Sequence, residues 1–109
     1  MDDFSWTSRG LTLRGKVTGP HDGTPVILLH GFLDTSAGFL PIMEALKDRW
    51  RLWTPDHRGH GTSDAIGKGG YYHFPDYLLD LDGLYTFLEI DEAVLVGHSM
   101  GASIACYFA

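Results

Sequence analysis

The stretch AVLVGHSMGASIACYFA, residues 93–109, decides how the rest of the chain is interpreted. Ala93 to Val96 is a short apolar run, typical of a strand buried on both faces of a parallel sheet, and Ala102 to Ala109 predicts a helix. A very tight turn must join them, because side chains at Gly97 and Gly101 would meet neighbouring backbone. We therefore expect a strand that ends near Gly97, a Ser99 with positive φ, and a helix from about residue 100.

Ser99 is the candidate nucleophile of this turn. The turn lifts its hydroxyl clear of the sheet, and the following helix directs free N–H groups and the positive end of its dipole at a developing oxyanion. Glycine–any–serine–any–glycine is a loose pattern, but its position between a strand and a helix favours a catalytic serine over an ordinary turn residue. His98 is disfavoured as the base, because an adjacent residue on a tight turn points away from the hydroxyl.

Further strands and helices are predicted on the N-terminal side of this stretch. Pro25 to His30 and Trp50 to Pro55 are strand candidates, and Phe4 to Thr18 predicts a strand pair or hairpin. Two helices are predicted from apolar residues at helical spacing. These lie at positions 39, 40, 42, 43 and 46 in the first helix and at 77, 78, 81, 84, 85 and 88 in the second. The first begins near residue 38 or 39, because Pro41 is tolerated only in a first turn, and the second begins at Pro75 and Asp76.

Strands that alternate with helices, each strand apolar throughout, predict the α/β class with a mostly parallel sheet and flanking helices. The chain has 109 residues, of which 44% are hydrophobic and 20% charged, values that suit one globular domain at most. A net charge of −6 without a basic stripe argues against a nucleic-acid partner. The longest apolar run, Val26 to Leu29, is too short to span a membrane.

The start of the chain is acidic and shows no signal-peptide pattern, and the one cysteine, Cys106, excludes an internal disulfide. Cytoplasmic location is therefore the expectation. His57 and His60 could suggest a metal site, but structural zinc needs four convergent ligands, so a loop that braces the site is favoured. Arg58 is interpreted as a structural ion-pair or hydrogen-bonding residue of that loop, with contact to substrate as the less favoured alternative. His30 is interpreted as a structural histidine that hydrogen-bonds backbone.

Three motifs together resemble the α/β-hydrolase fold family. They are His30-Gly31-Phe32 after the first buried strand, the stretch DHRGHGTSD at residues 56–64 after the next, and GHSMG at residues 97–101. The resemblance implies an oxyanion hole formed by the backbone N–H groups of Phe32 and Met100. It also implies that Gly31, Gly97 and Gly101 keep the loop and the nucleophile turn free of side chains.

In that family the triad runs in the order Ser, then Asp or Glu, then His. The resemblance therefore implies that residues 1–109 are the N-terminal part of a single α/β-hydrolase domain, truncated just after the nucleophile turn. The later strands, the cap and the triad acid and His are expected to lie outside this sequence, and the 109-residue chain is expected to be inactive.

The expected function of the complete protein is that of an esterase-like serine hydrolase, which acts on an ester, thioester or similar carbonyl through an acyl-enzyme on Ser99. The substrate would be a small molecule, with no metal or organic cofactor. Several reactions of the serine branch stay open, among them those of carboxylesterases, lactonases, C–C bond hydrolases and iminopeptidases. The alternative is a non-catalytic relative that acts as a binding or receptor module. The oligomeric state stays open.

Overall fold

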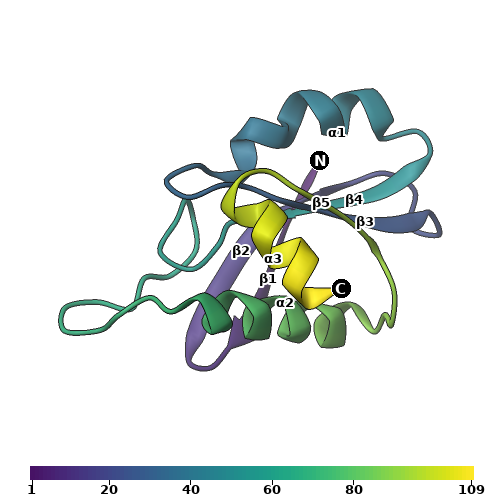
Figure 1. Ribbon diagram of the computed structural model, residues 1–109. Coiled ribbons are helices and arrows are strands. Elements are labelled where there is room, and N and C mark those ends of the chain that lie inside the picture. Colours follow the sequence, from purple (N-terminus) through teal and green to yellow (C-terminus); the bar gives the residue numbers. More distant parts are fainter.

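The computed structural model describes all residues from 1 to 109 and contains one five-stranded sheet in the order β1-β2-β4-β3-β5 (Figure 1). The strands are β1 (Asp2–Ser8), β2 (Leu11–Thr18), β3 (Thr24–Leu29), β4 (Trp50–Pro55) and β5 (Val94–Gly97). The helices are α1 (Leu40–Leu46), α2 (Phe74–Leu88) and α3 (Met100–Phe108), and a 3₁₀ turn, η1 (Ser36–Phe39), precedes α1.

The sheet combines an antiparallel ribbon with a parallel block. β1 and β2 pair along their length, joined at Arg9 and Gly10, which both have positive φ. β2 is also antiparallel to β4, whereas β3 pairs in parallel with both β4 and β5. Four of the five strands therefore run in the same direction and only β2 is reversed. The α/β class and its mostly parallel sheet are confirmed.

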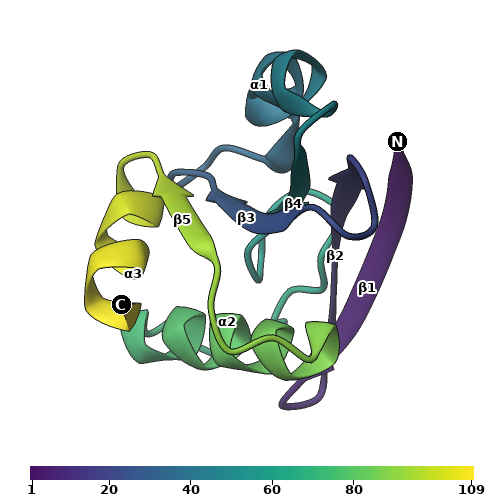
Figure 2. The same ribbon diagram turned by 90° about the vertical axis from the view of Figure 1, so that its right-hand side faces the viewer.

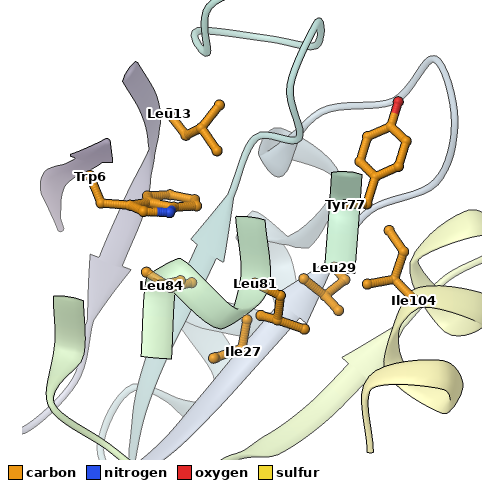
Figure 3. Close-up of a cluster of buried hydrophobic side chains, with 8 residues drawn as sticks. All are labelled: Trp6, Leu13, Ile27, Leu29, Tyr77, Leu81, Leu84 and Ile104. Carbon is orange, nitrogen blue, oxygen red and sulfur yellow. The ribbon is translucent and has the colours of Figure 1, made fainter. Parts of the chain in front are cut away.

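Side-chain alternation along β3 divides the core between the two faces of the sheet. Val26 and Leu28 pack with Met43 of α1 and Leu52 of β4 on one face. Ile27 and Leu29 face α2 and α3 on the other, in a cluster with Trp6, Leu13, Tyr77, Leu81, Leu84 and Ile104 (Figures 2 and 3). Because β3 is buried on both faces, its sequence is continuously apolar rather than alternating.

The helix starts follow from local sequence. In α2, Pro75 occupies the first turn, and the Asp76 carboxylate accepts the His73 backbone N–H as half of a capping box. The helix expected from residue 38 or 39 begins instead as the 3₁₀ turn η1, and the α-helix starts at Leu40 with Pro41 beside it. Pro41 has no N–H to donate, so the regular helix can begin only around it.

β5 is an edge strand, because it pairs only with β3. Val94 and Val96 on this strand are 46% and 39% exposed, in contrast to the buried valine and leucines of β3. The nucleophile turn follows directly from this open edge. None of the helices combines the length and the apolar character that crossing a membrane requires.

Candidate active site

Ser99 stands between the end of β5 at Gly97 and the start of α3 at Met100. Its φ is 56° and its ψ is −117°, a backbone conformation that a residue with a side chain rarely adopts. The expected strand–turn–helix conformation is therefore confirmed. The strain is held by backbone bonds on both sides: the His98 N–H donates to Leu29 O at 3.0 Å, and the Ala102 N–H donates to Ser99 O at 3.0 Å.

Three glycines allow this turn to pack tightly. A Cβ at Gly97 would overlap the backbone of Gly101, and a Cβ at Gly101 would overlap the carbonyl oxygen of Leu29 in β3. A Cβ at Gly31 would lie 3.1 Å from Cβ of Ser99, so the loop after β3 packs directly against the turn. Only glycine fits at the first two positions, because the atoms in the way belong to backbone.

The Ser99 side chain is exposed, and its hydroxyl makes no hydrogen bond within the chain. No histidine of the chain is bonded to it, including the neighbouring His98. The larger cavities are lined by other residues. A serine that acts as a nucleophile needs a base within hydrogen-bond reach of its hydroxyl.

Residues 31–34 form a tight turn beside Ser99. The Asp34 N–H donates to Gly31 O at 3.2 Å, and Leu33 has a positive φ of 63°. Phe32 is 62% exposed and its backbone N–H has no acceptor within the chain. Met100 is the first residue of α3, where an N–H has no intrahelical acceptor. Both expected oxyanion donors therefore lie in segments that touch Ser99, and their convergence on one point stays a prediction.

His30, which precedes the turn at residues 31–34, forms a reciprocal pair of hydrogen bonds with His57. The His57 backbone N–H donates to Nε2 of His30 at 3.0 Å, and Nε2 of His57 lies 2.9 Å from His30 O. Nδ1 of His30 lies 2.7 Å from Gly31 O. Burial lowers the pKa of His30, and burial together with the neighbouring His30 lowers the pKa of His57 to about 3. Both imidazoles are therefore neutral at pH 7.

Asp56 ties the loop of residues 56–64 to the start of η1. One carboxylate oxygen accepts the Ser36 N–H at 2.7 Å, and the other accepts the N–H and hydroxyl of Thr62 at 3.0 and 2.8 Å. Burial by itself would raise the pKa of Asp56, but the hydrogen bonds from Thr62 and Ser36 outweigh it and hold the pKa below its usual value. Asp56 is thus a structural anion.

Arg58 of the same loop pairs with Asp80 of α2. Its Nε and Nη2 donate to the two carboxylate oxygens at 2.6 and 2.7 Å, and both residues are buried. The hydrogen bond to Asp80 raises the pKa of Arg58. The Ser8 hydroxyl also donates to Asp80, at 2.6 Å, so this carboxylate links the loop, α2 and β1. The sequence predicted an ion-pair or hydrogen-bonding role for Arg58 but did not reveal its partner Asp80.

The end of the same loop is bonded to β2. Asp64 accepts the Thr12 N–H at 2.9 Å, and the Ser63 hydroxyl accepts the Arg14 N–H at 2.8 Å. Within the loop, Nδ1 of His60 lies 2.9 Å from Arg58 O, whereas its Nε2 is buried without a partner. The imidazoles of His57 and His60 therefore bond backbone oxygens, and the residues that hold the loop come from three different elements, η1, α2 and β2.

The comparisons with known proteins agree with this architecture. A family model for the alpha/beta hydrolase fold matches residues 24–109. A serine hydrolase-like protein of Danio rerio is 38% identical over 88% of this chain, and a 2-(acetamidomethylene)succinate hydrolase of Mesorhizobium japonicum is 41% identical over 84%. The solved structure of an alpha/beta hydrolase from Novosphingobium aromaticivorans superposes on 99% of the chain with a TM-score of 0.92 and 31% identity.

The matches cover only part of each relative. The chain spans 29% of the length of the Danio rerio protein, 31% of the Mesorhizobium japonicum protein and 39% of the Novosphingobium aromaticivorans chain. The family model nevertheless covers most of the present sequence, from the first strand of the parallel block through the nucleophile turn to the last residue. The chain belongs to the α/β-hydrolase fold family.

Proposed function

We propose that the complete protein is a serine hydrolase that cleaves an ester, thioester or similar carbonyl substrate through an acyl-enzyme on Ser99. One observation carries the proposal: Ser99 stands at a strained turn with φ of 56°, exposed, with glycines where side chains would block the backbone. Strain of this kind is maintained only where the surrounding structure enforces it, and it is concentrated at functional sites.

In the proposed reaction, Oγ of Ser99 attacks the carbonyl carbon while its proton passes to a histidine base. The carbonyl oxygen becomes an oxyanion, which the N–H groups of Phe32 and Met100 stabilise. The C–O or C–S bond then breaks, and the leaving alcohol or thiol takes the proton from the base. Water hydrolyses the acyl-enzyme by the same steps in reverse order. We place the base and its orienting acid outside residues 1–109.

Serine at position 99 favours this branch over relatives with an aspartate nucleophile, because attack by a carboxylate gives a different intermediate. Because a serine hydroxyl without an activating base is a weak nucleophile, we also propose that the 109-residue chain is inactive by itself. We also propose a small-molecule substrate and a cytoplasmic setting, the latter because the single Cys106 suits a reducing compartment.

The test compares two serine substitutions in the full-length protein. Ser99→Ala should abolish hydrolysis of p-nitrophenyl acetate and labelling by a fluorophosphonate, with a loss of about 10⁴-fold or more where activity is measurable. Ser103→Ala is the matched control, because Ser103 is exposed one turn further along α3, and it should keep wild-type rates. Binding of esters without turnover in the wild type would favour the alternative of a binding module.

A further inference from the structure

We propose that His57 is a positioning residue for the oxyanion loop, residues 31–34: its backbone N–H sets the tautomer of the His30 imidazole and its side chain fixes the His30 backbone, and together they turn the Phe32 N–H toward Ser99. This inference rests on the proposed hydrolase function, because the loop matters catalytically only if an oxyanion forms beside Ser99.

The tautomer of His30 follows from its two partners. The His57 backbone N–H can only donate, so Nε2 of His30, 3.0 Å away, must be the unprotonated acceptor. The proton of the neutral ring therefore lies on Nδ1. Gly31 O lies 2.7 Å from Nδ1 and accepts that proton. The backbone N–H of His57 thus determines which nitrogen of the His30 ring carries the proton and donates to Gly31 O.

The second step is the geometry of the peptide bond between Gly31 and Phe32. No peptide bond in the chain is cis, and in a trans peptide the C=O and N–H point in opposite directions. Gly31 O is held by Nδ1–H of His30 and by the Asp34 N–H at 3.2 Å. Two donors on one side of the peptide leave the Phe32 N–H directed to the other side, free of any partner in the chain.

The His57 side chain makes the second hydrogen bond of the pair. Its Nε2–H donates to His30 O at 2.9 Å, and the two ring centroids are 4.1 Å apart. This bond fixes the backbone of His30 at the end of β3, from which Gly31 and Phe32 follow. The His57 ring also packs edge to face against Tyr77 of α2, with the ring centroids 5.6 Å apart, and this contact helps to hold the imidazole in place.

The neighbours of His57 keep its backbone N–H from moving. The Asp56 N–H donates to Arg14 O at 2.8 Å, and Arg58 is fixed by its two bonds to Asp80. A residue anchored on both sides cannot turn its N–H away without breaking buried bonds. The conformation of the oxyanion loop therefore depends on contacts with the sheet and α2, and not on residues that touch substrate.

The test uses the full-length protein and two substitutions of His57. His57→Leu removes the donor to His30 O, and it should lower kcat at least about tenfold with KM unchanged, because only the transition state uses the oxyanion donors. His57→Gln places an amide N–H near the position of Nε2–H and should restore kcat to within about threefold of the wild type. The affinity of a boronic acid inhibitor should fall and recover in parallel.

A direct readout is the tautomer of His30, measured by ¹⁵N NMR of the wild type, and it requires no variant to fold. A proton on Nε2 would overturn the inference, and so would equal kcat in the wild type, His57→Leu and His57→Gln. If His57→Leu does not fold, His57→Asn replaces it, because its shorter amide cannot reach His30 O; wild-type kcat in that variant would also overturn the inference. Retained activity in Ser99→Ala would instead refute the proposed function, without affecting the measured tautomer.

Discussion

The turn at residues 97–101 and the loop at residues 56–64 follow neighbouring parts of one sheet, yet they are stabilised in opposite ways. The turn is fixed through its own backbone: glycines pack against backbone atoms, and backbone hydrogen bonds flank the strained Ser99. An open strand edge lies beside it. The loop is fixed by polar bonds to η1, α2 and β2 through Asp56, Arg58 and Asp64. Ser99, the proposed nucleophile, is therefore constrained by the backbone on one side and exposed on the other.

The largest effect is expected at the turn. Gly101→Ala places a Cβ on the carbonyl oxygen of Leu29, in the buried backbone of β3, where nothing flexible can give way. We expect a loss of more than about 4 kcal/mol in the free energy of unfolding, measured by urea denaturation. Gly83→Ala in α2 is the matched control, because the nearest atom to its added Cβ, Nε1 of Trp6, is 3.6 Å away. This variant should stabilise the chain by roughly 0.5–1 kcal/mol. Equal stability of both variants would refute the steric account of the turn.

The buried ion pair of the loop should give the next largest effect. Asp80→Ala leaves the buried Arg58 guanidinium without a counter-charge and should cost about 3–5 kcal/mol of unfolding free energy. The double variant Arg58→Met with Asp80→Leu should recover much of that loss, since it removes both charges. Lys47→Ala breaks an exposed pair with Glu44 and should change nothing measurable. A double variant no more stable than Asp80→Ala would show that the pair itself is required.

The smallest of the three effects is a dependence on acid. The pKa of His57 is about 3 in the folded chain and 6.5 in the unfolded chain. The unfolded state therefore binds the proton first as the pH falls. Its contribution to stability is complete above pH 6.5 and is lost as the pH approaches 3. Between pH 7 and pH 4, His57→Gln should lose roughly 3 kcal/mol less than the wild type in chemical denaturation. Parallel stability curves for the two proteins would contradict the lowered pKa.

The sequence was most informative where structure is local. The run at 93–96 and the glycines around Ser99 predicted the turn, because strand burial and steric room depend on adjacent residues. Asp80 was missed, although one signal was available: it lies on the apolar stripe of α2 with Tyr77, Leu81 and Leu84, where an unpaired charge would be costly. The structure shows why it is tolerated there, since Arg58 is 22 residues away in sequence and in direct contact.

By itself, then, the sequence determined the α/β class, the positions of the strands and helices, and the strained placement of Ser99. Only the tertiary structure decided that His57 meets His30 across 27 residues, and that Arg58 crosses to Asp80 rather than to solvent or substrate. The physical reason is range. Steric limits and side-chain periodicity act between residues close in the chain, whereas the partner of a buried polar group depends on which strands the sheet brings together.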